Sequence, residues 1–418
     1  MASNKDPIAQ AASRVGESLG LMLTRRDFTR FTLSGAATLL AIAPLFATLP
    51  ACTETKPKRE ITDMGGRKVS IPQEVSRLLC TNPIGTVDVY LLDPALLVGW
   101  NFKPQAADAA FLDEGALELP SLGVWMGAGS VPNGEEVLAR SPDVLLCFWS
   151  TDEAGIGMAD AIAAEMRLPV LLCDCDIRKV AETYRFLGEV LGIGGADDEG
   201  TGSTKSDAEE TGPEGGTAAL SERLGLLRAY FSEMLSLIED VVSRIPEAQR
   251  KSVYLSEGKG GLQTDPVGSL QVQDALDLLK TKNVVELPGS EGQGMGMPSV
   301  SIEQIITWDP DAVLVSEYSM SDTAKSDLYN EIRADANWQN VPCVKAGEVY
   351  QIPQSPFSWF GRPPSAMRLL GCLWLLERLY PEQAAEAGID LAAQTRRFFA
   401  TCLGYELSDA DIKMLLKE

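Results

Sequence analysis

The chain contains one helix–turn–strand pattern twice, and this repeat limits the folds that it can adopt. The first copy is NGEEVLARSPDVLLCF at residues 133–148, and the second is IEQIITWDPDAVLVSE at residues 302–317. Each has a short run with apolar residues at helical spacing, then a Pro-Asp turn, then an apolar stretch typical of a buried strand. A carboxylate stands seven residues before the proline in both copies, at Glu135 and Glu303. The repeat therefore predicts two related halves with the same local structure.

Strand-like and helical segments alternate on both sides of a central helix. The apolar runs RLLC, ALLVGW, DVLLCFW and PVLLCD come before it, with helical segments such as VAETYRFLGEVLG between them, and SVYLSE, AVLVSE and EVYQIP come after it. This alternation predicts an α/β fold with largely parallel sheets. We expect an N-terminal lobe at residues 60–193 and a C-terminal lobe at residues 246–418, with a ligand cleft between them at the carboxyl ends of the strands.

A single long helix is predicted between the lobes, over residues 217–245. At about 1.5 Å per residue it would be roughly 42 Å long, which suits a helix lying along the junction of two lobes. A coiled-coil dimer is the alternative interpretation. The apolar residues step by four and three alternately, so they form one stripe that ends before Pro246: Leu220, Leu224, Leu227, Phe231, Met234, Ile238, Val241 and Ile245.

The segment before this helix, residues 194–216, has a different composition. It consists mainly of Gly, Ser, Thr and acidic residues. A segment of this kind has too little apolar surface to form a packed core. We therefore expect a disordered acidic insertion between the N-terminal lobe and the long helix.

Composition excludes several classes of function. The 418 residues carry a formal net charge of −23, which is unfavourable for binding nucleic acid. The chain has no histidine, so it has no Ser-His-Asp or Cys-His catalytic pair and no His-ligated metal site. Its eight cysteines form no CxxC motif, and we expect buried free thiols. Cys173 and Cys175 alternate along a predicted strand and would point to opposite faces.

The N-terminal residues 1–51 are typical of an export signal. Arg25 and Arg26 are adjacent and precede an apolar region at residues 31–47, which is the form of a twin-arginine signal. Leu49-Pro50-Ala51 precedes Cys52 as in a bacterial lipoprotein cleavage box. We expect Cys52 to carry a lipid, residues 52–59 to form a tether, and the protein to be anchored at the outer face of the cytoplasmic membrane. An uncleaved anchor helix is the alternative.

Several stretches together resemble one known family, the periplasmic substrate-binding proteins of ABC importers for iron-siderophore complexes, haem and cobalamin. They are ITDMGGRKVSIPQEVSRLL, the two repeat copies, GLQTDPVGS followed by KNVVE, and SPFSWFGRPPSAMRLLGCLWLLERLYPE. The resemblance covers roughly residues 58–418 apart from the acidic insertion. It implies two Rossmann-like lobes joined by a single long backbone helix. It also implies a binding protein that is not an enzyme and whose partners are an ABC permease and its ATPase.

The resemblance implies a role for the two glutamates of the repeat. In the family, one surface glutamate on each lobe docks onto arginines of the permease, and Glu135 and Glu303 occupy the matching positions. Two carboxylates at a fixed spacing can set orientation through charge-assisted pairs. Glu136 is the neighbouring alternative in the first lobe. A purely structural role near a helix N-terminus is the other interpretation.

Candidate ligand-binding residues lie in turns after the predicted strands. Aromatic rings suit a flat or apolar ligand, and basic side chains suit ligand carboxylates. Related proteins often carry histidine after the GS of the second lobe, whereas Gln271 and Gln273 occupy that stretch here. The GQGMGMP segment at residues 292–298 resembles a dinucleotide loop only weakly, and we expect a loop at the cleft rim. The candidates are Asn82, Trp100, Trp125, Trp149, Tyr254, Lys259, Tyr318, Trp359 and Arg362.

These features predict that the protein binds a preassembled metal complex and needs no cofactor of its own. A bare transition-metal ion would need several soft or imidazole ligands, and the chain has no imidazole. An iron chelate or haem is the first expectation, and a corrinoid the second. The alternatives are a molybdate- or tungstate-binding protein of the same fold, and an exported redox enzyme that holds a cofactor.

Overall fold

The computed structural model describes residues 57–125, 131–193, 214–287, 297–317 and 327–417. The export signal, Cys52, Tyr318 and most of the acidic insertion lie outside these residues, as does most of the GQGMGMP segment. None of the helices in the described ranges is both long enough and apolar enough to cross a membrane.

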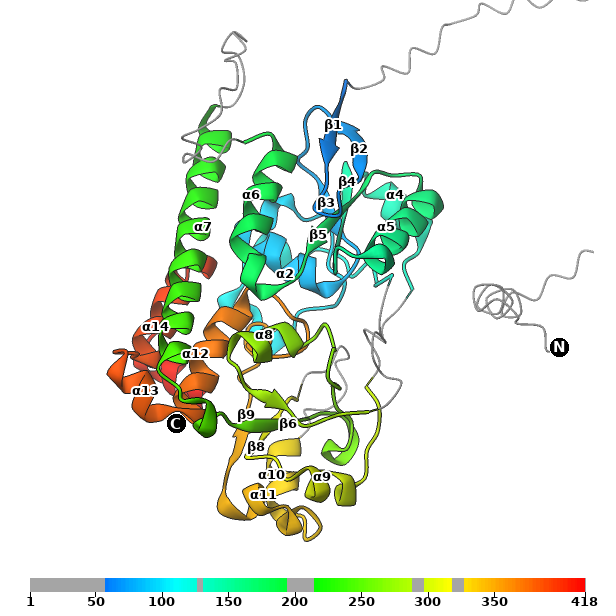
Figure 1. Cartoon of the computed structure of the whole chain (residues 1–418). Coiled ribbons are helices and arrows are strands. Elements are labelled where there is room, and N and C mark those ends of the chain that lie inside the picture. The colour runs from blue at the N-terminus through cyan, green and yellow to red at the C-terminus, as the bar shows by residue number, and fades with distance from the viewer. Residues whose placement is uncertain (1–56, 126–130, 194–213, 288–296, 318–326, 418) are drawn as a thin grey trace, which may run out of the picture. The chain divides into compact units, whose positions relative to one another are not determined.

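Two parallel sheets form the frame of the fold (Figure 1), as the alternating sequence pattern predicted. In the N-terminal lobe the strand order is β3-β4-β5, and in the C-terminal lobe it is β7-β6-β8-β9. A small antiparallel hairpin, β1-β2, precedes them. The strands are β1 (Lys58–Thr62), β2 (Lys68–Pro72), β3 (Leu78–Cys80), β4 (Val144–Trp149), β5 (Val170–Asp174), β6 (Ser252–Ser256), β7 (Lys282–Asn283), β8 (Ala312–Val315) and β9 (Val349–Gln351).

Helices cover these sheets and fill the space beside them. Those of the N-terminal lobe are α2 (Pro83–Leu92), α3 (Glu114–Leu117), α4 (Gly134–Ala139), α5 (Glu153–Met166) and α6 (Val180–Leu191). The long helix is α7 (Glu214–Ser243). Those that follow are α8 (Gln273–Leu278), α9 (Ile302–Trp308), α10 (Leu328–Ala334), α11 (Pro342–Ala346), α12 (Met367–Leu379), α13 (Pro381–Glu386), α14 (Leu391–Phe398) and α15 (Asp409–Leu416).

The repeated pattern folds as the same unit in both lobes. In each copy a short helix, α4 or α9, leads through a turn into a buried strand, β4 or β8. The aspartate after the proline ties this strand to its parallel neighbour. Asp143 Oδ2 accepts the backbone N–H of Arg77 just before β3 at 3.1 Å, and Asp311 Oδ2 accepts that of Ser252 in β6 at 2.8 Å. The repeat therefore fixes the register of adjacent strands as well as presenting a glutamate.

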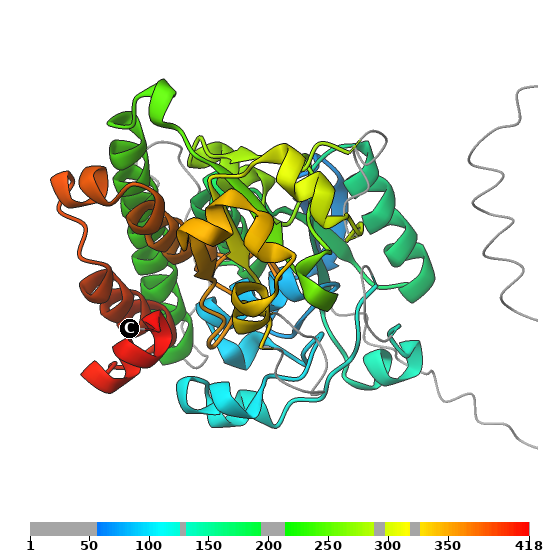
Figure 2. The ribbon, with the colours of Figure 1, turned by 90° about the horizontal axis from the view of Figure 1, so that it is seen from below.

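The long helix begins slightly earlier than expected and packs against both lobes. Residues 214–216, assigned to the insertion on composition, form the first residues of α7. The helix lies beside α6 of the N-terminal lobe and α12 of the C-terminal segment. Figure 2 shows the C-terminal helices gathered along α7 on one side of the molecule. The expected apolar stripe is the buried face of α7, because Leu224, Phe231 and Ile238 are fully buried.

The main hydrophobic core is continuous from one lobe to the other. It includes strand residues of both sheets, the buried stripe of α7 and nearly all of α12. Two smaller clusters cover the outer faces of the C-terminal and N-terminal sheets. The described residues between 57 and 417 accordingly form one compact unit.

One predicted strand is absent from the described structure. The ALLVGW run starts within a 3₁₀ turn, Pro94–Leu96, and pairs only through the isolated bridges Leu78↔Leu97 and Trp100↔Ser121. Asp93 caps this turn through its side chain, and Pro94 is suited to its first position, so the backbone curls where the apolar composition alone indicated extension.

The cysteines that the structure describes are free thiols. Burial raises the pKa of the Cys147 thiol to about 11 and that of Cys343 to about 12. Thiols with such pKa values stay protonated at neutral pH and are unreactive.

Candidate functional site

A pocket of about 310 Å³ lies between the two lobes. One wall comes from the end of β5 and the segments that follow β4 and β5, and the other from the first residues of α8 and the segment before it. Ligands of open α/β folds bind at the carboxyl ends of the strands, so this is the expected place. The lining residues are Ser150, Thr151, Asp152, Asp174, Cys175, Asp176, Lys179, Gly268, Ser269, Leu270, Gln273 and Asp274.

Two of the lining carboxylates are held by donors of the N-terminal lobe. Asp152 caps α5 and accepts two N–H bonds at 3.0 Å; the bond from Gly155 is the chief reason why its pKa lies below the usual value. Asp174 accepts from Nζ of Lys179 at 2.7 Å and from Oγ1 of Thr151 at 3.3 Å. The bond to Asp174 also raises the pKa of the Lys179 ammonium. This wall therefore carries fixed charges in defined positions.

The third carboxylate, Asp176, is paired with Arg178. Nε of Arg178 lies 2.9 Å from Oδ1 of Asp176, and its backbone N–H donates to the same oxygen. Burial works to raise the pKa of Asp176, but the bonds from Arg178 outweigh it and hold the pKa below the usual value. Asp176 is consequently ionised at neutral pH.

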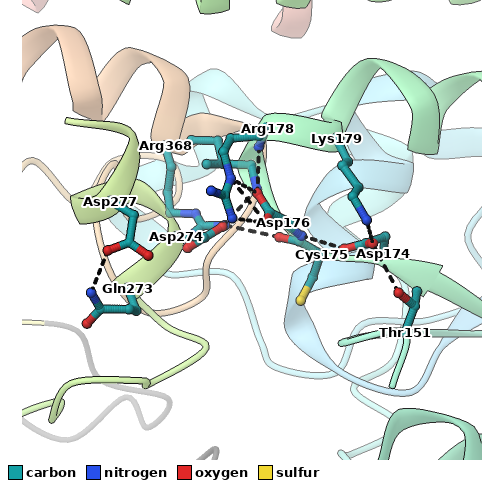
Figure 3. A network of polar contacts seen from close by, with 11 residues as sticks. Thr151, Asp174, Cys175, Asp176, Arg178, Lys179, Gln273, Asp274, Asp277 and Arg368 are labelled. Carbon is teal, nitrogen blue, oxygen red and sulfur yellow. Dashed lines mark hydrogen bonds and ion pairs between the residues drawn. The ribbon is translucent and has the colours of Figure 1, made fainter. Parts of the chain in front are cut away.

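The fourth carboxylate, Asp274, joins the two walls (Figure 3). It receives both terminal nitrogens of Arg368, at 2.5 and 2.8 Å. It also accepts the backbone N–H of Ile177 from the N-terminal lobe at 2.7 Å. Arg368 in turn donates to the carbonyl of Cys175 at 3.2 Å. One buried ion pair thus contacts both sides of the pocket.

A second charged cluster, formed by Arg362, Asp265 and Glu257, contacts the C-terminal wall of the pocket through Ser269. Arg362 donates to Asp265 at 2.5 Å and to Glu257 at 3.4 Å, and both carboxylates are buried. Burial, and then the charge of Asp265, raise the pKa of Glu257 to about 8. Asp265 also accepts from the hydroxyl of the pocket residue Ser269 at 2.8 Å. Arg362 therefore acts on the pocket through Asp265 and Ser269.

The pocket offers mainly hydrogen-bond acceptors. Four carboxylates and one ammonium line it, together with hydroxyl groups and the amide of Gln273. In the described part of the chain, no group of three or more cysteine or acidic side chains is placed to hold a metal ion. Such a lining can bind a solute whose rim donates hydrogen bonds.

Known proteins share this architecture. A family model described as periplasmic binding protein matches residues 227–356. An ABC transporter solute-binding protein from Sulfurospirillum deleyianum is 27% identical, with a TM-score of 0.69; the match covers 86% of this chain and 99% of that one. The present chain is a periplasmic binding protein of the ABC-transporter class. The family and its neighbours bind solutes and are not enzymes.

A curated relative of this binding protein is the molybdate-binding protein MolA of Haemophilus influenzae. The two are 26% identical over 351 residues, which is 79% of this chain and 88% of that protein. The structure of MolA bound to molybdate has a TM-score of 0.58 at 19% identity, and the match covers 84% of this chain and 99% of that one. This structural likeness supports the two-lobe fold.

Most of the predicted ligand residues lie in the core of the binding protein. Trp100 and Trp359 are fully buried, and the indole N–H of Trp100 donates to the carbonyl of Ala116 at 2.7 Å. Tyr254 is also fully buried, and Trp149 almost so. Asn82 caps α2 and donates to the carbonyl of Phe148 at 2.7 Å. In this structure these side chains present almost no surface to a ligand, because large aromatic rings gain most by being buried.

The other described candidates are more accessible. Trp125 is half-buried and lies beside the end of β3, where its backbone N–H donates to the carbonyl of Thr81 at 3.1 Å. Lys259 is exposed in the 3₁₀ turn Lys259–Gly261, after β6. Arg362 is mostly buried and is engaged by the two carboxylates described above. Gln271 is buried, whereas Gln273 lines the pocket.

The two glutamates of the repeat are exposed. Glu135 lies in the first turn of α4 and Glu303 in the first turn of α9. Hydrogen bonding from its own backbone N–H, and then from Ser301, lowers the pKa of Glu303. Glu136 is exposed in the same turn as Glu135.

The polar residues of the pocket are not among those that the sequence pattern indicated. Thr151 and Asp174 also stand at or just after the end of a predicted strand, but they are not among the predicted ligand residues. Position after a strand applies to both, but it does not separate them from buried candidates such as Trp149 and Tyr254. Nothing local marks Arg368, because its partner Asp274 is 94 residues away.

Proposed function

We propose that this binding protein captures a preassembled metal complex in the interlobe pocket and delivers it to an ABC permease. The pocket lining is the observation that supports this most, because four carboxylates and one ammonium line a space of about 310 Å³. Such a lining favours a compact complex whose amide, amine or hydroxyl groups point outward as donors. An iron chelate or a corrinoid has this chemistry.

Electrostatics favours such a complex over a free oxyanion. Like charges placed face to face in an interface oppose binding, and a doubly charged oxyanion would meet the carboxylates of Asp174 and Asp274. Lys179 is the one cation among the described residues of the lining, and Asp174 already engages it. A neutral or cationic complex meets no such opposition.

Calorimetry with a ligand panel tests the proposal. The panel contains ferric catecholate and hydroxamate chelates, haem, cobalamin, molybdate and free divalent metal ions. We expect one metal complex to bind tightly, and the Asp174→Asn variant to weaken it by about tenfold. Asp240→Asn, a change on the outer surface of α7, is the matched control. Tight binding of a free cation, with no response to any complex, would contradict the proposal.

A metal oxyanion such as molybdate is the second candidate ligand. It is favoured by the similarity to the molybdate-binding relative and by the pocket hydroxyls of Ser150, Thr151 and Ser269. In that case molybdate alone would bind in the panel. Lys179→Met would then abolish binding, because it removes the one ammonium found in the described part of the pocket lining.

The proposal extends to export and anchoring. Residues 1–51 would direct export through a twin-arginine signal, and Cys52 would carry the lipid that anchors the mature protein outside the cytoplasmic membrane. Fractionation of cells that express Cys52→Ala tests the anchor. The variant should move to the soluble fraction after export, and retention in the membrane fraction would rule out a lipid on Cys52.

A further inference from the structure

We infer that Arg368 and Asp274 form a positioning pair that fixes the distance between the two walls of the interlobe pocket. Neither the resemblance to known proteins nor the repeat assigns a role to these residues. The inference depends on the proposed function in one respect only, namely that the pocket holds the ligand.

The pair makes contacts on both walls at once. On the C-terminal side, Asp274 belongs to α8, and Arg368 also donates to the carbonyl of Gln271 at 3.4 Å. On the N-terminal side, Arg368 donates to the carbonyl of Cys175, and Asp274 accepts the N–H of Ile177. Cys175 directly follows β5. A change in the spacing of the walls would therefore break at least one of these bonds.

The geometry of the ion pair fixes the orientation of Arg368 relative to Asp274. Two terminal nitrogens of Arg368 meet the two oxygens of Asp274, a bidentate arrangement that fixes orientation as well as distance. The side chain of Arg368 is 1% exposed and that of Asp274 is 15% exposed. A buried ion pair adds little net stability compared with apolar packing, but removal of one partner leaves the other charge buried and uncompensated. We therefore assign the pair a geometric role.

The helix that carries Arg368 is itself fixed to the N-terminal lobe. Ala366, immediately before α12, donates its backbone N–H to the buried carboxyl of Asp88 in α2 at 2.7 Å. The start of α12 is thus held against the N-terminal lobe, and the side chain of Arg368 reaches from there to α8 of the C-terminal lobe. Arg368 does not line the pocket, so it acts on the ligand through Asp274 and the walls.

Loss of the pair should loosen the pocket without displacing its lining residues from their own strands and helices. Thr151, Asp174 and Lys179 keep their mutual contacts, which lie within the N-terminal lobe. The distance between the lobes should then vary more from molecule to molecule. Ligand affinity should fall as a result, because the productive spacing is populated only part of the time.

Distance measurements between spin labels test the inference without a ligand. Glu165 in α5 and Lys345 in α11 are exposed and lie in different lobes, so each is replaced by a keto amino acid that carries a label and leaves the native cysteines untouched. The parent protein should give a narrow distance distribution. Arg368→Met should broaden it, and Arg368→Lys should give an intermediate width, because lysine keeps the charge but not the bidentate geometry.

Arg397→Met is the matched control. Arg397 also forms a bidentate pair, with Glu233 at 2.5 and 2.6 Å, but this pair is exposed and joins α14 to α7. The Arg397→Met variant should leave the distance distribution between the two spin labels unchanged. If Arg368→Met fails to fold, Asp274→Asn replaces it, because asparagine keeps an acceptor for Ile177 and removes the charge. If the distance distribution of Arg368→Met, or of Asp274→Asn where it replaces that variant, is as narrow as that of the parent protein, the inference is overturned.

A ligand measurement completes the test. The complex that binds in the calorimetric panel should lose about tenfold in affinity with Arg368→Met, a usual size for coupling between two parts of a protein. Unchanged affinity would overturn the positioning role. If nothing in the panel binds the parent protein, the proposed function fails, while the distance distributions still decide whether the pair sets the spacing of the lobes.

Discussion

The buried carboxyl of Asp88 predicts that the stability of the fold depends on pH. Asp88 lies in α2 with its carboxyl against the start of α12, and burial raises its pKa to about 7. The bond from Ala366 and the charge of Arg368 oppose this shift but do not cancel it. Tyr184, Cys80 and Cys173 are the other titratable groups that it influences. Because its folded pKa lies above that of an unfolded aspartate, folding takes up a proton here.

The sign of the effect gives a pH-dependent prediction. The stability that Asp88 contributes is fully present below about pH 4 and is lost as the pH rises to 7. Asp88→Asn keeps an acceptor for Ala366 but removes the titration. Between pH 5 and 7 the free energy of unfolding of the variant should rise relative to the parent by about 2 kcal/mol. Denaturant unfolding at several pH values checks this, and a difference independent of pH would contradict it.

Among the elements, α7 holds the two lobes together through one arginine as well as through its apolar stripe. Arg223 donates to the carbonyls of Leu91 and Leu92 at the end of α2, each at 2.6 Å. It also donates to those of Thr401 and Cys402 near the C-terminus, at 3.2 and 2.8 Å. A cation is favourable where helix carbonyls lack partners.

Removal of this arginine should therefore destabilise the fold. Arg223→Met leaves four carbonyls without their donor, and we expect a loss of about 2–4 kcal/mol in the free energy of unfolding. Arg223→Lys should recover part of the loss. Arg244→Met is the control, because it removes only an exposed pair with Asp240, worth about 0.5 kcal/mol or less. Equal losses for Arg223→Met and Arg244→Met would show that the four bonds contribute nothing.

Elements with a strong local period could be predicted from the sequence. The stripe that includes Leu224 and Phe231 repeats at helical spacing, and it forms the buried face of α7. The paired helix–turn–strand units follow from the Pro-Asp turns. The ALLVGW run could not be assigned in this way, because a capped turn at Asp93 overrides the apolar pattern.

The site was harder to predict than the elements, because its contacts join distant residues. Cys175 and Arg368 are 193 residues apart, and no local pattern relates them. Trp100 and Trp359 are predicted to bind a ligand and are fully buried in this structure, because the apolar area that suits a ligand also suits the core. Position after a strand applies to Thr151 as well as to the buried candidates, so this signal alone could not separate the pocket lining from the core.

At the scale of the whole molecule, the two lobes present equivalent exposed helices that carry Glu135 and Glu303. We propose that these glutamates dock the protein onto arginines of the permease. The Glu135→Ala, Glu303→Ala double variant should abolish uptake in cells, whereas ligand affinity in solution should stay within about threefold. Glu222→Ala with Glu382→Ala, two exposed glutamates elsewhere, is the control. Loss of ligand affinity in the docking variant would contradict the assignment.

The central claim is that the pocket between the lobes carries a metal complex, and native mass spectrometry of the protein isolated from its own cells tests it most directly. We predict one metal complex bound per chain. We further predict that Thr151→Arg, which places a large side chain in the pocket, eliminates this species, while Ser232→Arg, in a groove between α6 and α7, retains it. A bound free oxyanion, or a metal complex that persists with Thr151→Arg, would contradict the account.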